Sequence, residues 1–357
     1  MRFFCILLMH KVESSPMHTT QLDLRGMSRD SLLACCAAAG VKPVHAEHLT
    51  AAIFRRGHSD IATIPEIPHR LRDHLLAHTF IQSPTIAADQ QSTDGTRKLL
   101  LKMGDGKAVE TVLIPAEGRL TQCVSTQVGC AMGCRFCLTA TAGLNRHLTA
   151  GEMVAEVMAG QQISDHRVRN LVLMGMGEPL HNYAAVAEFV RIASDPKGMA
   201  FSPNRITLST SGIVPKIYAM AEDQLPCNLA VSLNATSDAV RDQIMPINRK
   251  YPLAELMRAV RDYIAARGNK RVLIEYVLLA GVNDSLDDAK RLAALMDGVG
   301  CTVNLLPFNP YPGSRFARPD EADVEAFHTI LADQRIVVVV RRSRGRDISA
   351  ACGQLIE

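Results

Sequence analysis

From residue 122 onward the sequence alternates between short apolar runs and longer amphipathic runs, and this alternation restricts the fold more than any other feature. The apolar runs predict strands near residues 170–174, 205–209, 228–233, 271–279, 301–307 and 335–340. Runs with helical periodicity lie at residues 150–163, 183–192, 214–221, 253–267, 284–296 and 321–333. Strands that alternate with helices form a parallel sheet with the helices packed outside it. We therefore expect an α/β fold, either doubly wound or a full or partial (βα) barrel.

The residues before this sheet predict a small helical domain. Ser28 is a suitable N-cap for a first helix over residues 29–39. A second helix is expected over residues 44–56, and a third after Pro68. These helices carry several basic side chains, namely Arg55, Arg56, His69, Arg70 and Arg72. Such residues could contact RNA phosphates or could form the solvated face of a helical cap, and both options stay open.

A linker and a β-hairpin are expected between the two parts. The polar stretch 87–96 is the predicted linker, and strands over residues 98–103 and 108–114 flank a tight turn at Asp105-Gly106. Glu110 falls within the second strand, where a glutamate usually faces solvent. The predicted organisation is an N-terminal extension over residues 1–21, a helical accessory domain over 22–86, the linker and hairpin over 87–121, and the α/β unit with a C-terminal segment over 122–357.

The composition of this 357-residue chain is that of a folded protein, since 47% of its residues are hydrophobic. The net charge of +3 does not by itself indicate nucleic-acid binding, so an RNA-binding surface would have to be local. Ten cysteines without a regular framework indicate reduced thiols and a cytoplasmic location. The apolar run at residues 3–9 is too short to cross a membrane, and the initiator is either Met1 or Met17.

Three cysteines share the run Cys130-Ala-Met-Gly-Cys134-Arg-Phe-Cys137, whose C-x₃-C-x₂-C spacing lets all three thiolates reach one inorganic centre. Three soft sulfur ligands suit iron–sulfur or zinc better than a hard cation. Cys123 could close a zinc site as a fourth ligand, although structural zinc sites are usually built from two paired units. An iron site with one open position is the preferred interpretation.

Small polar residues follow several of the predicted strands at the points where they end. They are Gly177 and Glu178 in Gly-Met-Gly-Glu-Pro, Ser209, Ser232 and Asn234, and Asn309. Because functional residues in parallel α/β folds gather at the carboxyl ends of strands, we expect these residues to share one rim. Each alone is an ordinary turn or cap residue. Together they suit a polar ligand with an amino acid and a ribose portion.

The cysteine run with Phe136 before its last cysteine, followed by Gly-Met-Gly-Glu, resembles the radical S-adenosylmethionine (SAM) superfamily. More narrowly, the chain resembles the RlmN/Cfr family of RNA adenosine methyltransferases, and most of all its RlmN branch. Further motifs of that family are present as Ala108-Val-Glu-Thr-Val, Cys123-Val-Ser-Thr-Gln-Val-Gly-Cys130, Leu208-Ser-Thr-Ser-Gly212, Met245-Pro-Ile-Asn248, Ile274-Glu-Tyr276 and Asp347-Ile-Ser-Ala-Ala-Cys-Gly-Gln-Leu355. The resemblance runs from about residue 98 to the C-terminus and more loosely through the helical block. It implies a partial (βα) barrel of the radical SAM type.

Two cofactors follow from this resemblance. The cysteines Cys130, Cys134 and Cys137 would hold a [4Fe-4S] cluster whose open iron binds the amino and carboxylate groups of S-adenosyl-L-methionine. Seven positions match those that hold this molecule in the family: Gly177, Glu178, Ser209, Ser232, Leu233, Asn234 and Asn309. Asn234 replaces a histidine common in relatives, and its amide can still donate and accept hydrogen bonds.

The resemblance also implies a radical mechanism, because adenine C2 is too electron-poor to attack a methyl sulfonium. Cys352 would accept a methyl group from one S-adenosylmethionine, and a 5′-deoxyadenosyl radical from a second would abstract a hydrogen from that methyl. The resulting methylene radical would add to the adenine. Glu110 would remove the ring proton, and Cys123 would resolve the adduct by forming a disulfide with Cys352.

The implied substrate is an adenosine of 23S rRNA at the peptidyl-transferase centre, and the adenosine beside the tRNA anticodon is a second one in many members. A protein such as flavodoxin is the implied reductant, and no membrane partner is expected. The basic run Arg341-Arg-Ser-Arg-Gly-Arg346, with Arg135 and Arg146, could contact RNA phosphates or could be an ordinary solvated face.

Two other functions are open. A Cfr-type enzyme would methylate adenosine C8 in 23S rRNA and give antibiotic resistance, although Pro179 and Ser211 match the RlmN branch. A zinc-stabilised RNA-binding protein would use the same cysteines without catalysis.

Overall fold

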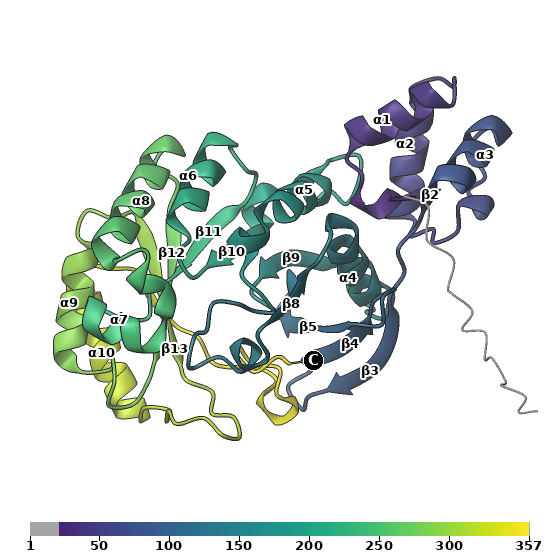
Figure 1. The fold of residues 1–357 in the computed structure, drawn as a ribbon. Coiled ribbons are helices and arrows are strands. Elements are labelled where there is room, and N and C mark those ends of the chain that lie inside the picture. Colours follow the sequence, from purple (N-terminus) through teal and green to yellow (C-terminus); the bar gives the residue numbers. More distant parts are fainter. Residues whose placement is uncertain (1–20, 357) are drawn as a thin grey trace, which may run out of the picture.

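The computed structural model describes residues 21–356, so the predicted extension, with Cys5 and Met17, lies outside the described residues. Within them, one ten-stranded sheet has the strand order β14-β13-β12-β11-β10-β9-β6-β5-β4-β3 (Figure 1). Its parallel strands are β6 (Arg119–Cys123), β9 (Val168–Leu173), β10 (Ile206–Thr210), β11 (Asn228–Ser232), β12 (Val272–Leu278), β13 (Cys301–Pro307) and β14 (Val338–Val340). The predicted α/β fold with a parallel sheet is thus confirmed.

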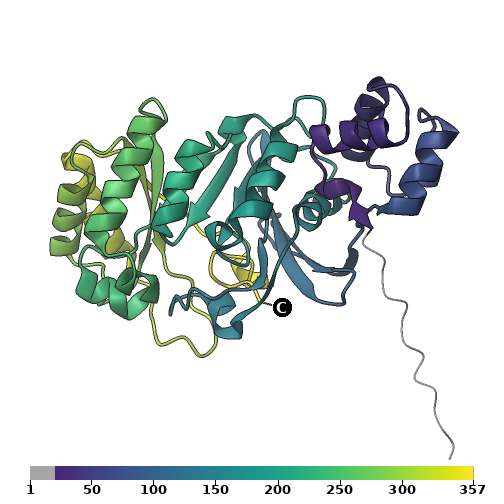
Figure 2. The same ribbon diagram turned by 45° about the horizontal axis from the view of Figure 1, so that its top comes forward.

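Helices between the parallel strands cover the outer face of the curved sheet (Figures 1 and 2). They are α4 (Ala150–Gln162), α5 (Tyr183–Ser194), α6 (Val214–Glu222), α8 (Leu253–Ala266), α9 (Leu286–Met296) and α10 (Glu321–Asp333), in close agreement with the predicted ranges. Their apolar sides and the buried faces of the strands form one continuous core. A short helix that was not predicted, α7 (Asp238–Ile244), follows β11.

The expected linker at residues 87–96 is wrong, because its first half belongs to a strand and its second half is the turn to the next strand. β3 (Thr85–Gln91) pairs antiparallel with β4 (Arg97–Lys102), which pairs with β5 (Ala108–Ala116) as predicted. β3 is an edge strand whose side chains are almost all exposed, so it lacks the apolar alternation by which strands are recognised. Since β5 also pairs with β6, the antiparallel strands extend the same sheet as the βα repeats.

The N-terminal block consists of the expected helices α1 (Arg29–Ala38), α2 (Val44–Thr50) and α3 (His69–His78), with a π-helical turn after α2 at Ala51–Arg55. β1 (Leu22–Asp23) and β2 (Thr79–Phe80) pair in parallel and join the two ends of the block. In Figures 1 and 2 this block lies beside α4 and α5, at the far end of the molecule from α9 and α10.

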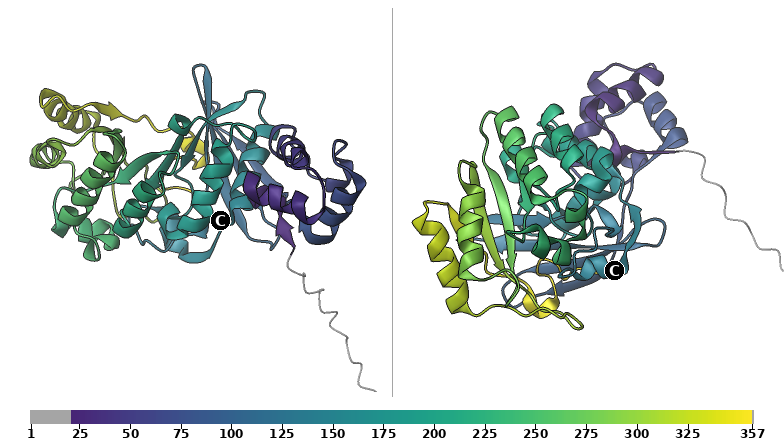
Figure 3. Two further views of the ribbon diagram at one scale, coloured as in Figure 1. Left: turned by 90° about the horizontal axis from the view of Figure 1, so that it is seen from above. Right: turned by 60° about the vertical axis from the view of Figure 1, so that its left-hand side comes forward.

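The C-terminal segment, residues 341–356, crosses from β14 toward the β3–β5 edge of the sheet (Figure 3). The backbone N–H of Gly345 donates to Asp94 Oδ2 at 3.0 Å. Asp347 accepts at 2.5 Å from the Ser92 hydroxyl, so the turn between β3 and β4 anchors the start of this segment. The last residues are therefore placed by strands that lie some 250 positions earlier in the chain, as the separation of Gly345 and Asp94 (251) shows.

Candidate active site

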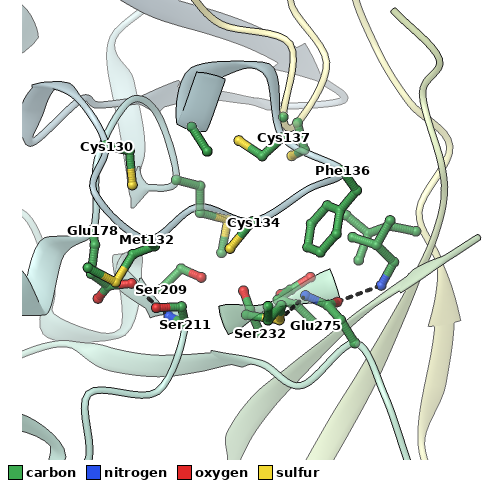
Figure 4. A pocket seen from close by; sticks show the side chains of 18 of the residues that line it. Cys130, Met132, Cys134, Phe136, Cys137, Glu178, Ser209, Ser211, Ser232 and Glu275 are labelled. Atoms are coloured by element: carbon green, nitrogen blue, oxygen red, sulfur yellow. Dashed lines mark hydrogen bonds between the residues drawn. The ribbon is translucent and has the colours of Figure 1, made fainter. Parts of the chain in front are cut away.

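A pocket opens at the carboxyl ends of the parallel strands (Figure 4), as the strand-end residues predicted. The predicted residues that line it are Cys130, Cys134, Cys137, Gly177, Glu178, Ser209, Ser232, Asn234, Asn309 and Cys352. Three other predicted residues, Leu233, Cys123 and Glu110, do not line this pocket and lie in the layers around it. Residues from six separate loops thus meet on one rim.

The loop of three cysteines is held between a short ribbon and α7. β7 (Gln127–Gly129) pairs with β8 (Leu144–His147), and the N–H of Cys130 donates to Gly143 O at 2.8 Å. Gly129 has φ +76°, and a Cβ there would lie 1.9 Å from the Gly143 oxygen, so only glycine fits this approach. The N–H of Arg135 donates to Ile244 O at 2.9 Å, which fixes the loop on the end of α7.

A cysteine binds a metal through its thiolate, so these three side chains become ligands only when a positive centre stabilises the deprotonated sulfur. Burial raises the pKa of Cys130 to about 12 and that of Cys134 well above its ordinary value, and the neighbouring cysteines reinforce both shifts. Among residues 21–356 no three His, Cys, Asp or Glu side chains come close enough together to hold one metal ion. Three cysteines that line one pocket fit an iron–sulfur cluster, because soft sulfur ligands are the ones such clusters use.

The pocket also contains polar atoms without a protein partner. Ser211 Oγ and Asn309 Oδ1 are buried and make no hydrogen bond, although both residues line the pocket. Buried polar groups are almost always paired, so these two atoms fit a polar ligand such as the amino acid or ribose portion of S-adenosylmethionine. The cysteine loop and these orphaned atoms together fit both cofactors implied by the sequence.

The Gly-Met-Gly-Glu turn is fixed by its own hydrogen bonds. Glu178 Oε1 accepts from the N–H of Leu180 at 3.0 Å and Oε2 from that of Ser211 at 2.7 Å, so the carboxylate ties the ends of β9 and β10 together. Burial raises the pKa of Glu178, and these hydrogen bonds oppose that rise. Any ligand ammonium would bind to a carboxylate that is already oriented.

The Gln127 side chain holds the Gly-Met-Gly-Glu turn in place through a hydrogen bond. Its Oε1 accepts from the Glu178 N–H at 2.8 Å, and its Nε2 lies 2.8 Å from His147 Nδ1 and 3.3 Å from His181 Nδ1. Since Nε2 can only donate, the Nδ1 atom of His147 must accept, which requires a neutral imidazole there. Gly177 makes room for this side chain, because a Cβ there would lie 2.6 Å from Gln127 Cβ.

Asn234 and Leu233 are held by the protein itself. Asn234 adopts φ 57°, a left-handed conformation that asparagine tolerates, and its Oδ1 accepts from the Val277 N–H at 2.8 Å. The Leu233 N–H donates to Glu275 O at 3.0 Å, while its side chain is fully buried. Only backbone atoms of Leu233 could therefore approach a ligand.

Cys352 stands on the pocket rim beside the end of the cysteine loop, and it is exposed. The Leu138 N–H donates to Gly353 O at 2.7 Å, so the C-terminal segment rests on η4 (Leu138–Ala142). The dense surroundings raise the pKa of the Cys352 thiol to about 11, with a further contribution from Glu275. Cys123, at the end of β6, is buried, and burial, followed by the charge of Cys352, raises the pKa of its thiol.

Glu110 corrects a prediction from the residues alone, because it does not face solvent. Its side chain is 8% exposed, and its Oε1 forms an ion pair of 2.8 Å with Lys98 Nζ. The Ile356 N–H donates to its Oε2 at 2.9 Å. Glu110 is buried because the C-terminal segment covers the face of β5 on which it lies.

Several lining residues were given no role in the site by the sequence analysis, namely Met132, Phe136, Thr210, Met245, Glu275 and Phe308. Glu275 is the one with a recognisable signal, because it is a carboxylate within the otherwise apolar β12. It accepts from Asn304 Nδ2 at 2.7 Å, and burial raises its pKa.

Comparison with known proteins agrees with this site. Residues 124–293 match the Radical SAM superfamily. The dual-specificity RNA methyltransferase RlmN of Rhodospirillum rubrum is 46% identical over 96% of this chain and 82% of its own length. That of Geobacter sulfurreducens is 46% identical over 94% of this chain and 92% of its own length.

The chain belongs to the RlmN family of radical SAM RNA methyltransferases. A crystal structure of a radical SAM methyltransferase from Sphaerobacter thermophilus superposes with a TM-score of 0.88, at 43% identity, over 94% of this chain and 99% of that one. The partial barrel expected for the family is thereby confirmed. Membership implies the [4Fe-4S] cluster and S-adenosylmethionine that the pocket fits. In the described part of this RlmN-family chain, no helix combines the length and apolar character needed to cross a bilayer.

Proposed function

We propose that the protein methylates C2 of an adenosine in the peptidyl-transferase centre of 23S rRNA and of the adenosine beside the tRNA anticodon, in the cytoplasm. The observation that carries the proposal is the position of Cys352 on the rim of a pocket that also contains the three-cysteine loop. The relatives are described as dual-specificity RNA methyltransferases, which supports two classes of RNA substrate.

In this proposal, Cys130, Cys134 and Cys137 hold the cluster, and the rim residues Gly177, Glu178, Ser209, Ser232, Asn234 and Asn309, with the backbone of Leu233, orient S-adenosylmethionine. When bound, the two cofactors supply methyl groups and a carbon-centred radical. The apolar lining from Phe136 and Met245 excludes water from the reacting carbon. A one-electron carrier such as flavodoxin serves as the reductant.

Cys352 carries the methyl group between cofactor and RNA. Its position on a segment that rests on η4, beside Cys137, supports this role, because the sulfur faces the pocket while remaining exposed to RNA. Glu110 takes the proton from the adenine ring. Cys123 then attacks the Cys352 sulfur, so that a disulfide forms as the methylated base leaves.

The RNA approaches over the C-terminal segment. Arg341, Arg342, Arg344 and Arg346 are all exposed there, next to the carrier cysteine, and suit backbone phosphates. Arg146 is less suited than expected, because it pairs with Asp105 at 2.6 Å and with Glu152 at 2.8 Å.

The test is nucleoside mass spectrometry after anaerobic reaction of the reconstituted protein with 23S rRNA fragments and with tRNA. We expect 2-methyladenosine in both RNAs, and none with Cys352→Ala. Formation of 8-methyladenosine alone would establish the Cfr-type alternative. Colourless, zinc-containing protein that binds RNA without modifying it would establish the non-enzymatic one.

A further inference from the structure

Arg241 is a completely buried arginine that no part of the proposed chemistry uses. It lies on α7, and its guanidinium reaches the turns after two neighbouring strands. Nε donates to Leu233 O at 2.9 Å, and Nη2 donates to Ser211 O at 2.7 Å and to Ser232 O at 3.2 Å. One planar side chain therefore holds the ends of β10 and β11 at a fixed separation.

Among residues 21–356, no carboxylate forms an ion pair with this guanidinium. Its fourth acceptor is Asn248 Oδ1, at 3.1 Å, so all four acceptors are neutral. Asn248 in turn donates to Asp238 at 3.0 Å and to Asp242 at 2.7 Å, and thus separates Arg241 from these carboxylates. A buried cation without an ion pair destabilises a fold unless the site gains negative charge.

The pocket that would gain negative charge is lined by the residues whose carbonyls Arg241 holds. Ser211 and Ser232 line the pocket together with Cys134 (Figure 4). The Ile244 carbonyl at the end of α7 accepts from Arg135 of the cysteine loop at 2.9 Å. Arg241 precedes Ile244 by less than one turn of α7, so the residue that carries the buried charge and the residue that holds the cysteine loop are neighbours on one helix. Arg241 is therefore linked to both halves of the pocket, to the strand ends through hydrogen bonds and to the cysteine loop through α7.

We propose that Arg241 is a positioning residue that holds the strand-end turns in the geometry that binds S-adenosylmethionine, and that its unpaired charge makes the cluster easier to reduce. Reduction adds one negative charge to the cluster, and a nearby buried cation stabilises the product of that step. This inference rests on the proposed function, since it assumes that the pocket holds both cofactors.

Two variants separate the hydrogen bonds from the charge. Arg241→Lys keeps a cation but loses the rigid planar fork of donors that spans the three carbonyls, whereas Arg241→Met loses both the charge and the donors. The matched control is Arg25→Met, because Arg25 is also buried but lies in the N-terminal block, where it bonds to Gln82 O. The full-length proteins are reconstituted anaerobically, and two quantities are measured: the dissociation constant for S-adenosylmethionine and the cluster midpoint potential from an electron paramagnetic resonance titration.

We expect tenfold or greater weakening of S-adenosylmethionine binding in both Arg241 variants. A shift to more negative potential is expected in Arg241→Met only, and neither change in Arg25→Met. Wild-type affinity in Arg241→Lys would overturn the positioning role. An unchanged potential in Arg241→Met would overturn the electrostatic role.

If Arg241→Met takes up no cluster, the charge is tested by Arg241→Gln, for which the same negative shift is expected and an unchanged potential overturns the role. Failure of the proposed function is distinguishable, since the wild-type protein would then bind no cluster or leave RNA unmethylated.

Discussion

Glu110 Oε2 accepts a hydrogen bond of 2.9 Å from the backbone N–H of Ile356, across a separation of 246 residues. The other oxygen pairs with Lys98 Nζ at 2.8 Å. The proposed base and the segment that carries Cys352 are therefore joined by one set of hydrogen bonds. Its order depends on a lysine of β4 that takes no part in the chemistry.

Removal of that lysine should destabilise the protein. Both side chains are about nine-tenths buried, at 10% and 8% exposure, so Lys98→Met leaves an uncompensated carboxylate at a cost of about 3–5 kcal/mol. The measurement is urea unfolding. Lys98→Met/Glu110→Leu should recover most of the loss, because it removes both charges, and Lys102→Met, which changes an exposed lysine of the same strand, should have almost no effect. Equal losses in Lys98→Met and Lys102→Met would contradict the buried pair.

Variants of the two proposed catalytic cysteines should stop the reaction at different steps. Cys352→Ala should yield no methylated C-terminal peptide and no methylated RNA, because the carrier sulfur is missing. Cys123→Ala should still methylate Cys352 but should accumulate a covalent protein–RNA complex that denaturing gels detect. The control is Cys301→Ala, a buried cysteine beside Met296, which should retain activity. Free RNA product from Cys123→Ala at the wild-type rate would exclude a disulfide-resolved adduct.

Gly177→Ala should weaken S-adenosylmethionine binding by about tenfold or more, which corresponds to about 1.4 kcal/mol. The new Cβ would lie 2.6 Å from Gln127 Cβ at φ +103°, so the turn that carries Glu178 would have to move. Gly118→Ala is the matched control, since Gly118 also has a positive φ, of +66°, but open space around it. It should lose only about 1 kcal/mol of stability and bind normally. Isothermal titration calorimetry measures the binding, and similar affinities of the two variants would refute a role for the close packing.

The hydrogen bond between Gln127 and His147 should weaken at low pH. Burial, followed by the neighbouring His181, lowers the pKa of His147 below its ordinary 6.5. The unfolded chain therefore binds more protons just below that pH, so stability is complete above about 6.5 and falls as the pH drops toward the folded-state pKa. Protonated His147 could no longer accept from Gln127, so S-adenosylmethionine affinity should fall at still lower pH, as the pH drops through the folded-state pKa. His147→Asn should flatten both profiles, whereas an unchanged pH dependence in this variant would remove His147 from the explanation.

Local patterns were enough to predict much of the architecture and the site. The predicted strand at residues 301–307 coincides with β13, because a buried parallel strand is a continuous apolar run bounded by turns. Likewise, the cysteine spacing and the polar residues after each strand predicted one rim, since carboxyl ends of parallel strands always share an edge. These features depend on neighbours within a few residues of each other.

Other features were decided only by tertiary structure. β3 is exposed along almost its whole length and becomes a strand only because β4 offers it an edge to pair with. Glu110 is buried because a segment 246 residues later lies across it, and no local pattern encodes such a contact. Arg241 likewise looks like a surface residue of a short helix until two strand ends close around it. The sequence by itself therefore determined the order of elements and the chemistry of the rim, whereas long-range packing decided which charges are buried and what they hold in place.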